Sequence, residues 1–360
     1  MWSCIITEIP TFVYRKLATV LSHIIANFFN ESISSGVFPD SIKVARVVPI
    51  FKSGDKSNVK NYRPISILSV MSKIFENLMS NRLNTYLRKF SVLTPCQHGF
   101  RAGSDTVDAI SEYLDDVYTS IDSKNFFISV FLDFSRAFDT VDHHILLSKL
   151  DNIGIRGPAL EWFETYLFNR SQFVQYNCHR SHTSISNSGV PQGSVLGPIL
   201  FNIYINDMHN CCGLKFVHYA DDTTVYMSGP DLNNVARDIN RHMALIDDWL
   251  KANRLSLNTS KSSVMVISKR VIVNQPEIMI RDELINWTSS MKFLGVTLDH
   301  NVNFKFHSLN VISKLSRSFG ILRKLSYYAP PSVMLCMYYS LFYSHMTYAL
   351  TVWGECSAYC

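Results

Sequence analysis

The chain has 360 residues, of which 47% are hydrophobic and 18% charged, so it can bury a sizeable core and is not a disordered tail. Its formal net charge of +5 suits a polyanionic partner but does not by itself identify one. The 8 cysteines include no Cys-x-x-Cys pair, which favours reduced thiols in an intracellular protein, nuclear or cytoplasmic and not secreted.

Residues 1–30 are expected to form an amphipathic helical lead-in. Glu8, Arg15 and Lys16 interrupt the apolar positions there, which argues against a signal peptide. Basic side chains then gather in the segment that follows, at Lys43, Arg46, Lys52, Lys56, Lys60 and Arg63. A cluster of this kind can follow the phosphates of a nucleic acid.

Residues 126–132 form a nearly continuous apolar run rich in aromatic and β-branched side chains, which predicts a buried central strand. The predicted strand ends at Asp133. Apolar residues then recur at helical spacing from Ala137 to Leu150. We therefore expect Asp133 to lie where a core strand gives way to a helix.

Residues 216–226 alternate with the period of two that an antiparallel strand requires, and Asp221 and Asp222 fall where the predicted hairpin turns. A tight hairpin turn ordinarily takes Asn-Gly or Asp-Gly. Two adjacent carboxylates lack the glycine and repel each other, an arrangement that a cation or a proton would stabilise. For the dipeptide alone, a solvated Asp-Asp turn is the simpler alternative.

Asp133 favours the metal alternative, because it adds a third carboxylate on a neighbouring sheet element. Three such carboxylates can hold two divalent cations roughly 3.5–4 Å apart, as in-line phosphoryl transfer requires. Magnesium fits hard oxygen ligands best, since no His and Cys set competes nearby. The elements mix hairpins with helix-linked strands, so we expect an α+β fold with an antiparallel sheet.

Residues 333–353 contain no Asp, Glu, Lys or Arg and are long enough to span a membrane. They also contain several tyrosines, serines and threonines and His345, a content that is poor for a spanning helix. We therefore expect this segment to be buried within the protein, and we expect no membrane partner.

Eight short motifs follow one another along the chain: SGVFP (35–39), PIFKSGD (49–55), NYRPIS (61–66), QHGFR (97–101), FLDFSRAFDTV (131–141), GVPQGSVLGP (189–198), YADD (219–222) and KFLGV (292–296). In this order they resemble the motifs of the reverse transcriptase domain of non-LTR retrotransposons, the long interspersed elements, and within them the jockey-like group. Eight motifs in register, covering roughly residues 30–355, leave little room for another family.

The resemblance implies an RNA-directed DNA polymerase with a right-hand architecture of fingers, palm and thumb, in which an antiparallel palm sheet carries the catalytic residues. Asp133, Asp221 and Asp222 would be both the catalytic residues and the ligands of two Mg²⁺ ions, for which Mn²⁺ can substitute. The implied partners are an RNA template, a DNA primer and dNTPs. The oligomeric state stays open.

The resemblance also implies residues that bind the nucleotide. Lys52 and Arg63 would grip the incoming triphosphate, since both supply positive charge to phosphoryl oxygens. Phe138 would select deoxynucleotides by clashing with a 2′-hydroxyl, and Phe134 and Gln192 would contact the nucleotide. Taken singly, these side chains fit surface charges, core aromatics and an ordinary Gly-Pro loop better than a nucleotide site.

Two further assignments follow from segments after the Asp pair. NTSK (258–261) resembles the family's segment there, which implies Lys261 as a general acid for the departing pyrophosphate. Phe293, Leu294 and Gly295 are implied as the primer grip, an apolar hairpin that positions the primer end.

The same resemblance divides the chain into a helical lead-in (1–30), fingers (31–125), a first palm segment (126–150), a fingers–palm connection (151–188), the main palm (189–302) and a thumb (303–360). We expect the thumb to be truncated and the sequence to be a fragment without an endonuclease. A catalytically inactive, nucleic-acid-binding remnant is therefore an alternative to an active polymerase. A nucleotide cyclase on a palm-like sheet is a third, and it leaves Lys52, Arg63 and Gln192 unexplained.

Overall fold

The computed structural model describes residues 9–272 and 274–354 of the chain. Internal contacts divide these residues into two units, each assembled from separate stretches of sequence. Unit 1 comprises the described residues up to Pro95, together with Phe134–Met208 and Asp248–Ser256. Unit 2 comprises Cys96–Asp133, His209–Asp247 and the described residues from Leu257 onward.

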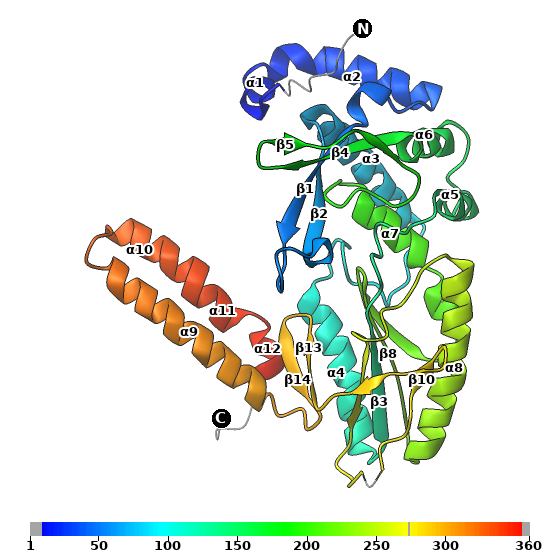
Figure 1. Cartoon of the computed structure of the whole chain (residues 1–360), viewed down its shortest axis with the longest axis vertical. Coiled ribbons are helices and arrows are strands. Elements are labelled where there is room, and N and C mark those ends of the chain that lie inside the picture. The colour runs from blue at the N-terminus through cyan, green and yellow to red at the C-terminus, as the bar shows by residue number, and fades with distance from the viewer. Residues whose placement is uncertain (1–8, 273, 355–360) are drawn as a thin grey trace. The chain divides into compact units, whose positions relative to one another are not determined.

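Unit 1 combines helices with a small mixed sheet (Figure 1). The strands follow the order β2-β1-β4-β5, with β6 paired to β4, and β1 runs antiparallel to β2 and parallel to β4. The elements are α1 (Thr11–Lys16), α2 (Ala18–Ser35), β1 (Ala45–Phe51), β2 (Tyr62–Ile67), α3 (Val70–Lys89), α5 (His143–Asn152), α6 (Pro158–Leu167), β4 (Arg170–Tyr176), β5 (His179–Arg180), β6 (Ser184–Ser186) and α7 (Gly197–Ile205).

Aromatic side chains form much of the core of unit 1. Phe29 of α2 stacks on Phe75 of α3 with ring centroids 4.0 Å apart, and Trp162 of α6 meets Phe75 edge-on at 5.1 Å. Such pairs add about 0.5–1.5 kcal/mol beyond the burial of their area. The expected helical lead-in corresponds to α1 and α2, which meet at Leu17, while residues 1–8 lie outside the described residues.

Unit 2 is built on a second sheet, flanked by helices and followed by two small hairpins. Its strands are β3 (Phe126–Leu132), β7 (Lys215–Tyr219), β8 (Asp222–Gly229), β9 (Ser263–Ile267), β10 (Met279–Ile280), β11 (Glu283–Leu284), β12 (Asn286–Trp287), β13 (Ser290–Phe293) and β14 (Val296–Asp299). Its helices are α4 (Thr106–Asp122), α8 (Leu232–Ala252, whose last residues belong to unit 1), α9 (Lys305–Leu325), α10 (Pro331–Met337), α11 (Ser344–Thr347) and α12 (Leu350–Trp353).

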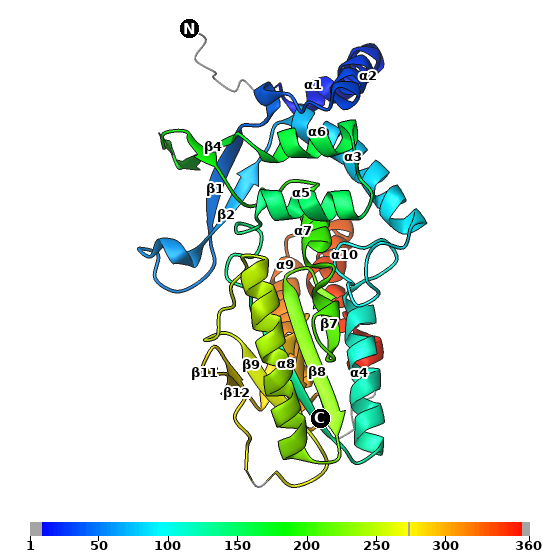
Figure 2. The ribbon, with the colours of Figure 1, turned by 90° about the vertical axis from the view of Figure 1, so that its right-hand side faces the viewer.

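The sheet of unit 2 has the order β12-β9-β3-β8-β7 and is antiparallel except between β9 and β12. Its middle strand, β3, confirms the buried central strand predicted for residues 126–132. One face packs against α4, where the Ser129 and Tyr113 hydroxyls lie 2.7 Å apart, and α8 lies on the other side of β8 (Figure 2). Burial on both faces explains why the run is apolar at nearly every position.

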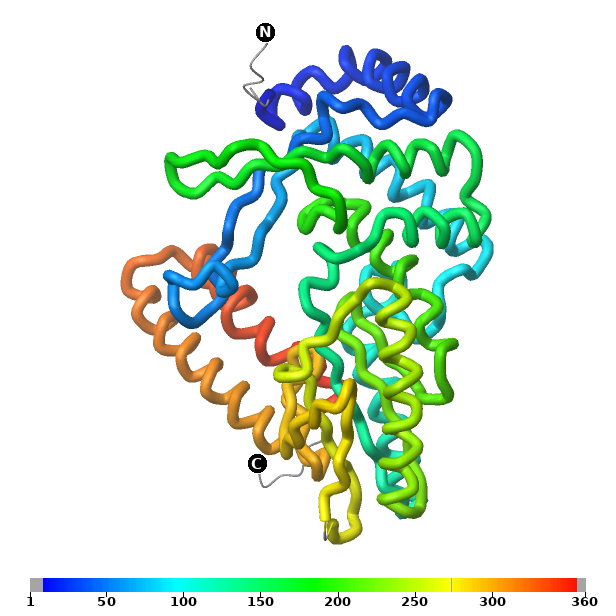
Figure 3. The backbone as a smooth tube through the Cα atoms, turned by 45° about the vertical axis from the view of Figure 1, so that its right-hand side comes forward, coloured from blue at the N-terminus to red at the C-terminus, as the bar shows by residue number. Residues whose placement is uncertain are grey.

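Near the end of the described residues lies a helical hairpin in which α10, a π-helical segment (Tyr338–Tyr343) and α11 return along α9 (Figures 1 and 3). The predicted burial of residues 333–353 is wrong for several side chains, including Leu335 and Tyr339, which are 56% and 54% exposed. The reason is that this segment packs against α9 along one side and leaves its other side to solvent. In the described part of the chain, no helix combines the length and apolar character needed to cross a bilayer.

Candidate active site

The two adjacent aspartates lie at the turn between β7 and β8. Pairing runs from Lys215 opposite Tyr226 to Tyr219 opposite Asp222, so Ala220 and Asp221 form the turn and Asp222 begins β8. The predicted hairpin is therefore confirmed. The strained position is Ala220, whose φ of 58° lies in a region that residues other than glycine, asparagine and aspartate adopt rarely.

Asp133 follows the last residue of β3, on the strand adjacent to β8. Leu132 pairs with Thr223, so one residue further along each strand Asp133 comes opposite Asp222. The Asp133 backbone is held from a third direction, since its N–H donates to Ser262 Oγ (3.2 Å) and its carbonyl accepts from Asn258 N (2.8 Å). The three predicted carboxylates thus come from the ends of neighbouring strands.

The helix expected directly after Asp133 is absent from this described stretch. Turns occupy residues 135–139, where Arg136 takes a φ of 51° and its carbonyl accepts hydrogen bonds from Asp139 N and Thr140 N. Helix α5 begins only at His143, where the Asp142 side chain caps it by accepting from Ile145 N at 3.0 Å. The apolar residues between Ala137 and Leu150 are therefore buried partly on a turn and partly on α5, and they do not belong to one helix.

The three carboxylates interact electrostatically. Burial, together with the charges of Asp221 and Asp133, raises the pKa of Asp222 to about 6. Lys261 offsets some of this charge, with its Nζ 4.0 Å from Asp133 Oδ2. No group of three or more His, Cys, Asp or Glu side chains in the described residues is already arranged to hold a metal ion. The raised pKa and the hard oxygen donors nevertheless suit a cation such as Mg²⁺.

The QHGFR segment, for which the sequence suggested no individual role, holds the Asp hairpin in place. Residues 96–98 pair with β7 through His98 N to His218 O (2.9 Å) and His218 N to Cys96 O (2.8 Å). The buried Gln97 side-chain oxygen accepts from Gly99 N (2.8 Å) and from Ala220 N (3.1 Å), inside the turn itself. The QHGFR motif marked this segment in the sequence, but only the fold shows that Gln97 contacts the Asp hairpin.

Other predicted residues lie in unit 1. Lys52 and Arg63 are exposed on the β1–β2 hairpin, where Arg63 pairs with Ile50 and Lys52 N donates to Asn61 O at 2.9 Å. Phe134 is buried, and the half-buried Phe138 packs on Phe201 with ring centroids 4.7 Å apart.

Gln192 lies beside a cavity of about 330 Å³ within unit 1. Its amide nitrogen donates to Asp139 Oδ1 at 2.8 Å, and its backbone carbonyl accepts from Ser66 N at 2.7 Å. His143 and Arg170 also line this cavity. The loop that carries Gln192 is therefore fixed both to β2 and to the turn after Phe138.

The predicted apolar hairpin at residues 293–295 is confirmed as β13 and β14, joined by Leu294 (φ 44°) and Gly295 (φ 92°). The Tyr348 hydroxyl donates to Leu294 O at 2.6 Å and closes over Gly295, where an added Cβ would lie 2.9 Å from the tyrosine ring. The C-terminal helical segment therefore braces this hairpin.

Residues 52–298 match the family described as reverse transcriptase (RNA-dependent DNA polymerase). The chain belongs to this family. It therefore carries a nucleotidyltransferase domain of a class that generally depends on divalent metal ions. Its α+β polymerase fold is supported by the same match.

The most similar relatives include three RNA-directed DNA polymerases of Drosophila melanogaster, which confirms the resemblance to the jockey-like group. The probable polymerase from transposon BS is 31% identical over 79% of this chain and 32% of the relative. The polymerase from mobile element jockey is 28% identical (82% and 33%), and the probable one from transposon X-element is 28% identical (91% and 37%). The chain thus spans about a third of these relatives.

Among solved structures, apo telomerase from Candida tropicalis, truncated from its C-terminal domain, is similar with a TM-score of 0.49. The two chains are 12% identical over 78% of this chain and 58% of that one.

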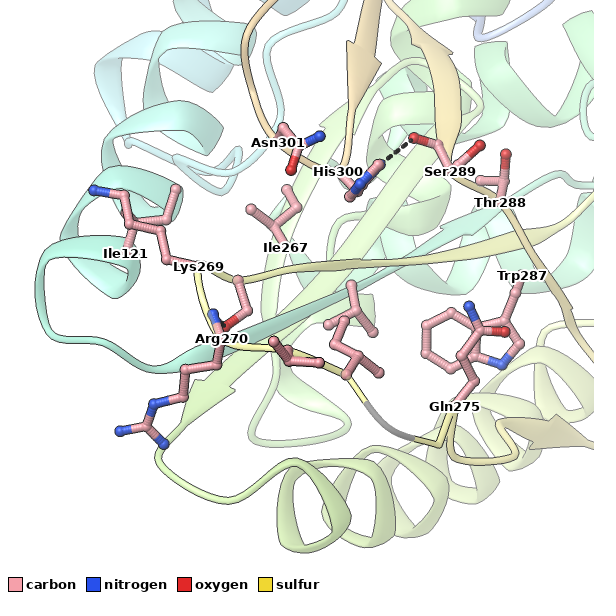
Figure 4. A pocket seen from close by; sticks show the side chains of 14 residues that line it. Ile121, Ile267, Lys269, Arg270, Gln275, Trp287, Thr288, Ser289, His300 and Asn301 are labelled. Carbon is pink, nitrogen blue, oxygen red and sulfur yellow. Dashed lines mark hydrogen bonds between the residues drawn. The ribbon is translucent and has the colours of Figure 1, made fainter.

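A cavity in unit 2 of this reverse transcriptase chain lies away from the predicted site residues. It measures about 720 Å³ and is lined by Lys269, Arg270, Trp287, His300 and others (Figure 4). None of the described residues predicted for catalysis, nucleotide binding or primer grip lines it. This cavity is therefore separate from the candidate site at the strand ends.

Proposed function

We propose that this domain acts as the RNA-directed DNA polymerase of a non-LTR retrotransposon, adding dNTPs to the 3′-hydroxyl of a DNA primer on an RNA template. The observation that carries the proposal is the meeting of Asp133, Asp221 and Asp222 at neighbouring strand ends. Burial and the charges of Asp221 and Asp133 raise the pKa of Asp222, which supports a role in binding cations.

Asp133, Asp221 and Asp222 would hold two Mg²⁺ ions, for which Mn²⁺ could substitute. When bound, such ions stabilise charge on the attacking 3′-oxygen, the α-phosphate and the leaving pyrophosphate. The protein's part is to fix the carboxylates, and the backbone bonds to Asp133 and Ala220 support this role. Fixed charges need no rearrangement as the reaction proceeds.

The remaining residues would bind and orient the nucleotide. The exposed Lys52 and Arg63, on paired strands, would contact the triphosphate. Phe138, held against Phe201, would close the space beside the sugar 2′ position. Gln192 would contact the nucleotide. Phe134, which is buried, would support the nucleotide site from within the core.

Two segments of unit 2 would act on the leaving pyrophosphate and on the primer. Lys261, mostly exposed and 4.0 Å from Asp133, would donate a proton to pyrophosphate as it leaves. The Phe293–Gly295 hairpin, braced by Tyr348, would position the primer end.

We further propose the right-hand assignment for this chain, with fingers in 31–125, palm in 126–150 and 189–302, their connection in 151–188 and thumb from 303. The mostly antiparallel sheet of unit 2, which bears the three carboxylates, supports the palm assignment. The helical hairpin from Lys305 onward supports the thumb assignment.

The test is incorporation of dTMP on poly(rA)/oligo(dT) with Mg²⁺ by the wild-type chain, an Asp221→Asn, Asp222→Asn double variant and an Asp151→Asn control at an exposed site. Incorporation by the wild type and the control, lost in the double variant, is the expected result. A folded wild-type chain that binds the hybrid without incorporation would contradict the proposal and favour a non-catalytic nucleic-acid-binding remnant.

A further inference from the structure

The loop that carries Gln192 is fastened to the turn that follows Phe138. Val190 N donates to Phe138 O and Gly189 N donates to Val141 O, each at 2.8 Å. Gly189 has a φ of 83°, and a Cβ there would lie 2.6 Å from Asp139 O, so glycine is required for this approach. Hydrogen bonds therefore join the loop that carries Gln192 to the turn that carries Phe138.

A buried histidine adds to the same junction. His143 is 3% exposed, and its Nε2 lies 2.8 Å from Gly189 O. Because a carbonyl oxygen can only accept, Nε2 must carry the proton, and burial lowers the pKa of His143, which favours the neutral ring. The loop is thereby held from the α5 side as well.

The contact between Asp139 and Gln192 fixes the orientation of a side-chain amide. The Gln192 nitrogen lies 2.8 Å from Asp139 Oδ1. An ionised carboxylate only accepts hydrogen bonds, so the NH₂ group must face Asp139 whichever way the amide is assigned. The Gln192 side-chain oxygen then points away from Asp139.

We propose that Asp139 is a positioning residue: it holds the Gln192 amide so that the carbonyl oxygen is presented to the sugar of the incoming nucleotide, beside the ring of Phe138. This inference rests on the proposed polymerase function. An acceptor oriented in this way suits a sugar hydroxyl and not a phosphate. Since Asp139 follows Phe138 directly, the same contact also keeps the acceptor and the sugar-excluding ring in register, so it contributes to discrimination between deoxynucleotides and ribonucleotides.

The test compares the wild type with Asp139→Ala, Asp139→Asn, Gln192→Ala, the Asp139→Ala, Gln192→Ala double variant and an exposed-site control, Asp151→Ala. Steady-state kcat and KM are measured for dTTP and UTP on poly(rA)/oligo(dT), and thermal melting verifies folding. We expect Asp139→Ala to raise KM for dTTP about tenfold and to lower the dTTP-to-UTP preference, as loss of one charge-assisted hydrogen bond predicts.

Two comparisons separate positioning from a merely structural role. Asp139→Asn keeps a carbonyl that can accept from Gln192, so it should recover most of the loss, and the double variant should be no worse than Gln192→Ala alone. Additive losses, or a fall in kcat with the dTTP-to-UTP preference unchanged, would overturn the inference.

A binding measurement keeps failure of this inference distinct from failure of the proposed function. The Kd of a fluorescent dTTP analogue is measured on the protein–hybrid complex for the same variants. A wild type that binds the analogue selectively without turnover contradicts the polymerase proposal alone. A selectivity that Asp139→Ala leaves unchanged overturns the positioning role.

Discussion

Replacing Gly99 by alanine should displace the Asp hairpin. A Cβ at this position would lie 2.3 Å from Ala220 N and 2.9 Å from Tyr219 C, distances that Cβ atoms essentially never show. Both obstructing atoms are backbone, so no side chain can rotate away. The φ of Gly99 is not positive, so the alanine backbone itself is tolerated, and the lower entropy of the unfolded chain would stabilise the variant by about 0.4–1 kcal/mol.

The unfavourable terms are larger. Forcing a methyl group into a packed site costs about 1–3 kcal/mol. Moving Gly99 away from the turn also loosens the two hydrogen bonds to Gln97 Oε1, each contributing about 1 kcal/mol. The net expectation is a loss of about 3 kcal/mol in the free energy of unfolding. A shift of the turn by about 1 Å would also lower polymerisation about 100-fold, because Asp221 lies on it.

Urea unfolding followed by circular dichroism gives the stability, and dTMP incorporation on poly(rA)/oligo(dT) gives the activity. The matched control is Gly320→Ala in α9, where an added Cβ meets nothing within 4 Å and alanine should stabilise the helix by up to about 1 kcal/mol. A Gly99→Ala protein with wild-type stability and activity would refute the reasoning that this close approach fixes the hairpin.

Three further results are expected. The Asp221→Asn, Asp222→Asn variant should melt a few degrees higher than the wild type in EDTA, because charge repulsion is removed, and it should lose the rise in Tm that Mg²⁺ gives the wild type. Burial lowers the pKa of His218 from 6.5 to about 3. Below pH 6.5 the unfolded chain therefore binds a proton that the folded protein does not, and the free energy of unfolding declines as the pH falls. Between pH 7 and pH 5 the wild type should therefore lose about 2 kcal/mol more stability than His218→Asn, measured by urea unfolding. Phe138→Val should raise UTP incorporation relative to dTTP about tenfold or more, measured by single-nucleotide extension, because the ring that would exclude a 2′-hydroxyl is gone.

Each of these has a contrary outcome. An equal Mg²⁺-dependent rise in Tm in the double Asp variant would place the stabilising cation elsewhere. Parallel pH profiles for the wild type and His218→Asn would show that the protonation is carried by other histidines, such as His143, whose pKa burial also lowers. An unchanged UTP-to-dTTP ratio in Phe138→Val would remove this ring from the sugar site.

Local patterns predicted the elements that carry the carboxylates. The apolar run ending at Asp133 became the central strand β3, and the alternation around Asp221 became the β7–β8 hairpin. The same kind of pattern failed after Asp133, where apolar spacing does not reveal that Arg136 adopts a positive φ and makes a turn. It failed again in residues 333–353, since lack of charge does not distinguish a buried segment from one that is covered on one side only.

Contacts between distant residues were beyond any local pattern. Gln97 and Ala220 are 123 residues apart, and Asp139 and Gln192 are 53 apart, yet each pair shares a hydrogen bond. Nothing in the spelling of either motif indicates its partner, because the pairing depends on which strands and turns become neighbours after folding. The motifs identified the residues, and the topology identified what holds them.

The way the carboxylates are held bears on how their repulsion can be relieved. Asp133 is tied to the 258–262 segment through its backbone N–H and carbonyl, and the turn preceding Asp221 is tied to Gln97. Backbone displacement would therefore break hydrogen bonds worth about 1 kcal/mol each. What remains is to protonate Asp222, whose pKa is already raised, to rotate side chains, or to bind cations. At neutral pH Asp222 is largely ionised, so the three carboxylates repel one another. A bound divalent ion would remove this repulsion, which would add to its affinity for the site.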